Sequence, residues 1–265
     1  MIQSELFEAN RSYWTGRAPG YSEVNRTELN TKQHQKWRWE IYRSIRNRFP
    51  DTPAGEIRVL DAGCGPGFFS IILAELGFSV TAIDLSPAMI REARKNAGRL
   101  AGTITFREMN AEKLDFPDAV FHAVVSRNLT WNLPHPEKAY QEWMRVLVPG
   151  GLLLNFDANW YRFLFDEEAA RGYEEDRKQT ALSGIKDENI GENFDVMEQI
   201  ARQVPLSKIQ RPQWDRQILT GIGMKTTCDP EIWKSLWSAE EKINFSSTPL
   251  FMLQAVKSID NGNSV

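Results

Sequence analysis

The sequence contains few of the residues that mark several common protein functions. Its 265 residues include 2 cysteines, Cys64 and Cys228, which lie too far apart to suggest a disulfide framework or a metal site. The formal net charge is −3 and there is no polybasic segment, so nothing indicates a nucleic-acid or membrane partner. No apolar run approaches the roughly 20 residues of a membrane span. The opening residues also lack the pattern of a signal peptide. We therefore expect a cytoplasmic globular protein without a bound metal, and nothing indicates its oligomeric state.

Apolar strands alternate with helical segments between residues 56 and 157. The expected strands cover residues 57–62, 78–84, 103–109, 119–126 and 151–157. Two further strands are expected at 225–229 and 248–257. This alternation predicts an α/β fold with a doubly wound, mostly parallel, seven-stranded sheet.

Helical segments flank this alternating region on both sides. In residues 1–55, Trp37, Ile41 and Ile45 recur at helical spacing, which predicts a helix packed on the core. Residues 158–211 are acidic, prone to form helices and free of convincing strands. We expect them to form a helical cap, inserted after the fifth strand beside the strand ends where such folds bind ligands. The chain is then a single domain, 1–265, with its core at 56–157 and 212–258.

A glycine cluster follows the first expected strand in the segment "VLDAGCGPG". Gly63, Gly65 and Gly67 allow positive φ and let a ligand lie against bare backbone, and the next helix directs free N–H groups to the same place. Asp84 ends the second strand, where a carboxylate can accept both hydroxyls of a ribose. The pattern therefore predicts a nucleotide-shaped ligand, and the alternative is a tight turn of the kind found in any α/β protein. The third glycine comes one residue too early for the dinucleotide fingerprint, which disfavours NAD or FAD.

In order and spacing, "VLDAGCGPG", "AID" and "VLVPGG" resemble motifs of the class I S-adenosylmethionine-dependent methyltransferases. The resemblance runs from about residue 58 to 157 and is strongest to the small-molecule branch of the ubiquinone/menaquinone biosynthesis enzymes. It implies a Rossmann-like methyltransferase fold and S-adenosyl-L-methionine as the cofactor. It also implies methyl transfer to a small-molecule acceptor by in-line displacement.

The resemblance also assigns roles to individual residues of the cofactor site. Asp84 is expected to hold the ribose, and Asn110 replaces an acid that usually meets the adenine amino group. Ser126 is expected beside the transferred methyl. The expected cofactor-binding residues are Tyr21, Asp61, Gly63, Gly65, Gly67, Asp84, Leu85, Met89, Asn110, Ala111 and Ser126.

The acceptor side is less well marked by the sequence. Asn128 and Trp131 replace histidines that are frequent in relatives, and none of the three histidines is a persuasive base. Asp157 ends the fifth strand and is the candidate catalytic residue, although a cap or a turn at the strand end is the alternative. In similar enzymes an aromatic segment before the first strand covers the cofactor, so residues 1–55 are expected to form a lid. The expected substrate pocket consists of Tyr13, Trp14, Asn128, Trp131, Asn159 and Trp160, whose aromatic members would otherwise be ordinary core.

Two other functions stay open at this point. An RNA methyltransferase is supported only by the arginines at 38, 43, 46 and 48 in the N-terminal segment. A non-catalytic protein that binds the cofactor as a ligand or sensor would carry the same glycine turn.

Overall fold

The structure, a computed structural model, describes residues 3–187 and 194–259. Residues 1–2 of the expected lid, residues 188–193 of the expected cap and residues 260–265 lie outside the described residues.

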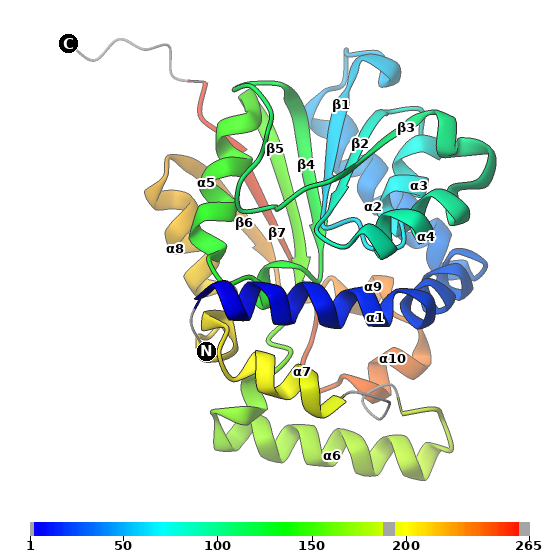
Figure 1. The fold of residues 1–265 in the computed structure, drawn as a ribbon, viewed down its shortest axis with the longest axis vertical. Helices are drawn as coiled ribbons and strands as arrows, with labels where there is room; N and C mark the ends of the chain where they lie inside the picture. The colour runs from blue at the N-terminus through cyan, green and yellow to red at the C-terminus, as the bar shows by residue number, and fades with distance from the viewer. Residues whose placement is uncertain (1–2, 188–193, 260–265) are drawn as a thin grey trace.

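One seven-stranded sheet forms the centre of the molecule (Figure 1). Its order is β3-β2-β1-β4-β5-β7-β6. The strands β1 to β5 run parallel to one another, whereas β7 is antiparallel to both β5 and β6. This confirms the predicted fold. The strands are β1 (Arg58–Ala62), β2 (Ser79–Asp84), β3 (Ile104–Glu108), β4 (Phe121–Arg127), β5 (Leu147–Asp157), β6 (Met224–Asp229) and β7 (Phe251–Lys257).

Helices cover both faces of this sheet. The helices α2 (Lys32–Arg48), α3 (Phe68–Glu75), α4 (Pro87–Ala97) and α9 (Trp233–Leu236) contribute to the hydrophobic core on one face. The helices α5 (Pro136–Val146) and α8 (Gln213–Gly221) contribute to the core on the other face. Local signals set several boundaries: the Ser86 hydroxyl caps the N-terminus of α4, and Gly77 adopts a φ of +80° after α3.

The apolar stripe of α2 packs as its spacing predicts. Trp37, Ile41 and Ile45 are all fully buried. The Trp37 ring meets Phe68 of α3 edge-on and also meets Phe156 of β5, with centroid separations of 6.0 and 5.1 Å. This helix therefore belongs to the core of the domain, because its large side chains fill the space over the sheet.

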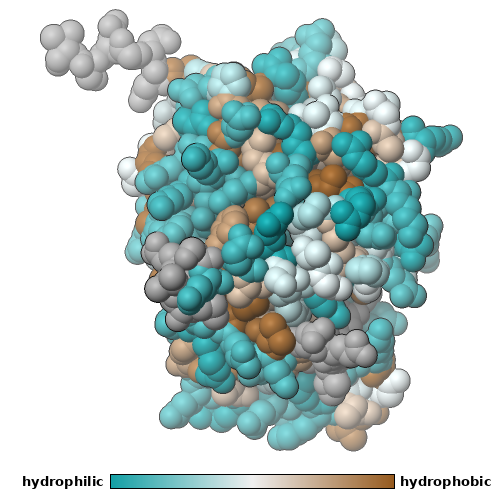
Figure 2. Space-filling model, in the orientation of Figure 1, coloured by the Kyte–Doolittle hydropathy of each residue, from teal (hydrophilic) through white to brown (hydrophobic). Residues whose placement is uncertain are grey.

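The remaining helices gather at the carboxyl end of the parallel strands. The 27-residue helix α1 (Gln3–Leu29) runs across that end, and α7 (Phe194–Ala201) and α6 (Glu167–Ser183) lie beyond it (Figure 1). The helix α10 (Ala239–Asn244) packs against α6. The face seen in Figure 2 is largely hydrophilic, with hydrophobic residues in small groups.

Two regions differ from the sequence-based expectation. Strand β5 begins at Leu147, four residues before the expected start at residue 151. The short helices α9 and α10 between β6 and β7 were not predicted, although the Ser238 to Glu241 capping box is a recognisable start signal for α10.

A buried cluster of charged side chains joins the segment before α8 to the end of β5. Arg211, Asp157 and Asp215 are each at most 1% exposed. The Arg211 guanidinium lies 2.8 Å from an Asp157 oxygen and 2.6 Å from an Asp215 oxygen. It also donates to the Thr130 hydroxyl at 2.6 Å. Because charges out of water are costly unless they are paired, this cluster fixes the relative positions of three segments of the chain.

We predict that Arg211→Met lowers the free energy of unfolding by about 3–5 kcal/mol, because it leaves two buried carboxylates without their cation. Urea denaturation measures the change. The control is Arg202→Met. Arg202 is paired with Glu198 at 3.8 Å and its side chain is 54% exposed, so the expected loss is under about 1 kcal/mol. Equal losses in the two variants would contradict this account.

Candidate functional site

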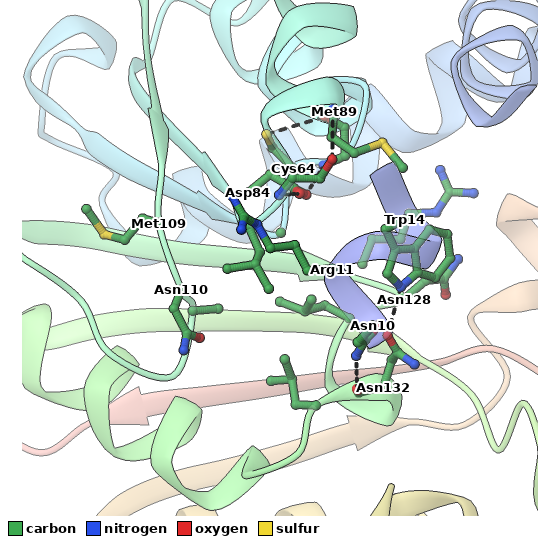
Figure 3. A pocket seen from close by; sticks show the side chains of 18 of the residues that line it. Asn10, Arg11, Trp14, Cys64, Asp84, Met89, Met109, Asn110, Asn128 and Asn132 are labelled. Atoms are coloured by element: carbon green, nitrogen blue, oxygen red, sulfur yellow. Dashed lines mark hydrogen bonds between the residues drawn. The ribbon is translucent and has the colours of Figure 1, made fainter. Parts of the chain in front are cut away.

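A pocket opens at the carboxyl ends of β1, β2 and β4. Helix α1 forms its roof, and Figure 3 shows side chains from α1 and from the loops after the strands turned towards the same space. This edge of the sheet, beside the point where strand order reverses between β1 and β4, is where α/β folds bind ligands. Most of the residues expected at a ligand site line this pocket: Trp14, Tyr21, Asp61, Gly63, Gly65, Asp84, Leu85, Met89, Asn110, Ala111 and Asn128.

The glycine turn exposes backbone on the pocket floor. Gly63 has a φ of +70°, and a Cβ there would lie 2.7 Å from the Leu129 side chain. Gly65 has a φ of +52° and faces the Tyr21 ring. Two features therefore disfavour a side chain at Gly63: the positive φ and the short distance to Leu129.

Two acids lie beneath this turn. Asp84 accepts hydrogen bonds from the backbone N–H of Gly65 at 2.9 Å and of Ser86 at 2.8 Å. Burial raises the pKa of Asp84 to about 6, against the opposing effect of these bonds. Burial likewise raises the pKa of Asp61 to about 7, although the Ser70 hydroxyl donates to it at 2.5 Å. Because both pKa values are raised towards neutral pH, a ligand that donates hydrogen bonds to these carboxyl groups can change their ionisation.

The loop after β3 closes one side of the pocket. The Asn110 side-chain oxygen accepts the Glu112 N–H at 2.8 Å, which forms a local turn. Trp143 donates from Nε1 to the Ala111 carbonyl at 3.1 Å and so fixes the loop against α5.

Several predicted site residues do not line the pocket. Gly67 has a φ of +94° and caps α3, packed against Ala93. Ser126 is fully buried within β4, whereas the next residue, Arg127, reaches the pocket, because successive strand residues face opposite sides. The predicted residues outside the lining are Tyr13, Gly67, Ser126, Trp131, Asp157, Asn159 and Trp160.

The aromatic members of that set pack between α1 and the insertion after β5. The Trp131 ring stacks on Tyr161 with centroids 5.0 Å apart. Trp160 meets Phe245 edge-on at 5.3 Å, and Tyr13 packs into the same apolar cluster as Trp131. Asn159 instead exchanges two hydrogen bonds of 3.0 Å with the backbone of Arg211. In the described structure Trp131 is buried, and Tyr13 and Trp160 are partly buried against the same apolar cluster, which fits the alternative that these aromatic residues pack in the core.

Asp157, the predicted catalytic residue, is fully buried in the ion cluster described above. One carboxylate oxygen accepts from the Thr130 hydroxyl at 2.5 Å and from the Trp131 N–H at 2.9 Å, besides its contact with Arg211. The other accepts the Ala158 N–H at 2.9 Å. Both carboxylate oxygens are thus engaged within the chain, and this geometry offers no support for a catalytic role of Asp157.

Sequence reasoning missed Arg127, one of the arginines that line the pocket. Its guanidinium pairs with Glu28 of α1 at 2.9 Å and lies over the rings of Trp37 and Phe68, 4.6 Å from each centroid. Glu28 is separated from Arg127 by 99 residues in sequence, so no local pattern signals the pair.

The α1 side chains of the roof were also missed, apart from Trp14 and Tyr21. Asn10 donates to the Asn132 carbonyl at 2.7 Å, and Trp14 donates to the Asn132 side-chain oxygen at 2.8 Å. Arg11 pairs with Glu108 at the end of β3, at 2.9 Å. Polar bonds therefore hold α1 against the ends of two strands. The lining residues that the sequence did not suggest on α1 are Phe7, Asn10, Arg11 and Asn25.

Comparison with known proteins indicates the family of this domain. Residues 60–155 match the model of a methyltransferase domain. This part of the chain is a methyltransferase domain, and it is similar to the class I S-adenosylmethionine-dependent methyltransferases. This match agrees with the S-adenosylmethionine cofactor expected from the sequence.

Individual relatives match only part of their length. A ubiquinone/menaquinone biosynthesis C-methyltransferase of Zymomonas mobilis is 34% identical over 119 residues, 44% of this chain and 47% of that protein. A trans-aconitate 2-methyltransferase of Streptomyces coelicolor is 31% identical over 153 residues, 54% of this chain and 50% of that protein. The chain thus spans about half the length of these relatives.

Solved structures share the fold across most of the chain. A methyltransferase of Aquifex aeolicus aligns with a TM-score of 0.54 at 16% identity, covering 88% of this chain and 97% of that one. Within the residues that the structure describes, no cluster of His, Cys, Asp and Glu could hold a metal ion. No helix in the same part of the chain is suited to cross a membrane.

We predict that binding of S-adenosylhomocysteine near pH 6 releases protons. Ligand hydroxyls that donate to ionised Asp84 favour its charged form and lower its pKa from about 6, so affinity should rise as the pH increases through 6 and then level off. Titration calorimetry in two buffers of different ionisation enthalpy measures the released protons. Asp84→Asn should remove most of the pH dependence, whereas an unchanged profile in that variant would assign the proton to another group such as Asp61.

Proposed function

We propose that this protein transfers a methyl group from S-adenosylmethionine to a small-molecule acceptor. The single observation that carries the proposal is the position of Asp84 and Gly65. A carboxylate that ends β2 lies beside bare backbone after β1, and both line a pocket roofed by α1. The named relatives act on small molecules, which supports the acceptor class.

The residues of the pocket fit this cofactor from one end to the other. Asp84 is placed to accept the ribose hydroxyls, and the Gly63 to Gly65 backbone gives the sulfur-bearing chain a floor without side chains. At the end nearest Tyr21 and Asn25, Arg127 offers a cation for the carboxylate of the amino-acid portion. The Asn128 side-chain oxygen also lines the pocket and is buried without a partner among the described residues. It can accept a hydrogen bond from the ammonium group of the cofactor's amino-acid portion.

The cofactor supplies an electrophilic methyl group, and the residues of the chain position the acceptor for in-line displacement. Alignment of the two reactants can contribute about 7–11 kcal/mol to lowering the barrier, without any side chain exchanging a proton. We propose that the segment 1–55 acts as the lid through α1, and that the cap 158–211 supports that lid. Together they would keep water from the reacting atoms.

The role of Asp157 in this proposal is indirect. Its carboxylate holds the Thr130 hydroxyl and the Trp131 N–H, and these residues follow Asn128 in the loop after β4. Asp157 would thus set the position of the loop that faces the methyl group.

The RNA alternative finds little support in the N-terminal arginines. Arg43 pairs with Glu40, Arg46 donates to backbone carbonyls of Pro50 and Thr52, and Arg48 donates to the Gly150 carbonyl. Three of the four arginines that supported this alternative are thus engaged within the chain.

We expect S-adenosylmethionine and S-adenosylhomocysteine to bind in titration calorimetry and NAD not to bind, because the pocket follows a methyltransferase glycine turn. Incubation with methyl-labelled S-adenosylmethionine and a metabolite extract should give a labelled small molecule, identified by its mass. Binding of NAD without a response to S-adenosylhomocysteine would overturn the proposal. Tight cofactor binding without transfer to any extract would favour a sensor.

We predict that Arg127→Met weakens S-adenosylhomocysteine binding roughly tenfold or more, the usual range for a lost charged hydrogen bond. Binding of 5′-methylthioadenosine, which lacks the amino-acid portion, should change much less. The ratio of the two affinities removes any general effect of leaving Glu28 unpaired. Arg26→Met, on the exposed side of α1, is the control and should leave both affinities unchanged. An equal loss for both ligands would place the carboxylate elsewhere.

A further inference from the structure

A buried hydrogen-bond acceptor on α1 faces the pocket without a partner. Asn10 lines the pocket and is 7% exposed. Its amide nitrogen donates to the Asn132 carbonyl at 2.7 Å, which fixes the orientation of the side chain, because the oxygen could not make that bond. The Asn10 oxygen is buried, and no hydrogen bond reaches it from any described residue. Buried polar atoms of this kind are rare and call for a donor from outside the chain.

The position of Asn10 places it at one end of the pocket. The neighbouring residue Arg11 is paired with Glu108, the last residue of β3, and the chain continues directly into Met109, Asn110 and Ala111 of the lining. Leu85 and Leu133 are further apolar residues of the lining, and we call the part of the pocket beside Met109, Asn110 and Ala111 the slot. Arg127 pairs instead with Glu28, near the other end of α1. With the ribose on Asp84 and the amino-acid portion towards Arg127, the flat adenine ring falls in this slot.

The expected partner of the adenine amino group is already engaged. The Asn110 oxygen accepts the Glu112 N–H in a turn of its own loop. In Figure 3 the Asn110 side chain lies apart from the group formed by Asn10, Trp14 and Asn132. The Asn10 oxygen, by contrast, accepts no hydrogen bond from the described residues, and Asn10 lines the roof of the same pocket.

We propose that the Asn10 side-chain oxygen accepts a hydrogen bond from the 6-amino group of the cofactor's adenine. This inference rests on the proposed function and deepens it, because it makes α1 the element that reads the base. A ligand N–H satisfies the buried oxygen, whereas a 6-oxo group would bring two acceptors together. Such a site rejects the analogue that lacks the donor.

The test compares S-adenosylhomocysteine with S-inosylhomocysteine, in which a 6-oxo group replaces the amine. The wild-type protein should prefer the adenosyl ligand by at least about tenfold. Asn10→Leu should remove most of that preference, because it removes the acceptor. Asn10→Asp cannot donate to the Asn132 carbonyl but keeps an accepting oxygen, so the preference should persist even if α1 is less firmly held.

The ratio of affinities separates base recognition from a structural effect. If Asn10 only held α1 in place, Leu and Asp variants would lose affinity for both ligands equally and keep the ratio, which would overturn the inference. A collapsed ratio in Asn110→Leu with an unchanged ratio in Asn10→Leu would also overturn it, in favour of Asn110. If the wild-type protein binds neither ligand, the proposed function itself fails, and that outcome is distinct from the others. Binding of the inosyl ligand by Asn10→Leu shows that the variant retains a folded pocket.

Discussion

The ion pair between Arg211 and Asp157 is the contact on which the arrangement of the site depends. Three segments that are distant in sequence meet at these charges: the end of β5, the loop after β4 and the segment that leads into α8. Each charge is costly in an apolar interior, so removal of one leaves the others with an unfavourable desolvation energy. The Thr130 hydroxyl and the Trp131 N–H donate to the same Asp157 carboxylate. These two hydrogen bonds therefore fix the loop that carries the neighbouring pocket residues.

Above this foundation the site combines two kinds of surface. The floor is backbone and carboxylate, formed by the Gly63 to Gly65 turn and Asp84, and it suits a ligand with hydroxyls and an extended chain. The roof is α1, which contributes amide, aromatic and cationic side chains that the floor lacks. The floor belongs to the part of the chain that matches the family model, whereas the roof lies outside residues 60–155. The floor and the roof of the pocket thus come from different parts of the sequence.

The sequence predicts the floor well because its signals are local. A continuous apolar strand, glycines at fixed spacing and an acid at the next strand end lie within 26 contiguous residues, 59 to 84, and each has a direct physical reason. All seven strands were recognisable for the same reason, with errors at boundaries such as the start of β5. The roof could not be read in this way. Asn10 and Asn132 are 122 residues apart, and the pairing of Asp157 with Arg211 spans 54 residues. Asp157 was assigned to catalysis from its strand-end position, since nothing near it in sequence reveals the buried arginine.

Asn132 gives the domain a mechanical property. Its backbone carbonyl and its side-chain oxygen each accept a bond from α1, while its side-chain nitrogen lies 3.7 Å from the sulfur of Met197 on α7. A single residue between the roof and the insertion is therefore shared by both. Swinging α1 away from the strands breaks two polar bonds at this residue and disturbs its contact with α7, so the two elements share one barrier to opening. Entry and exit of ligands would then follow one cooperative event, whose rate reflects the strength of the junction and not the flexibility of either helix alone.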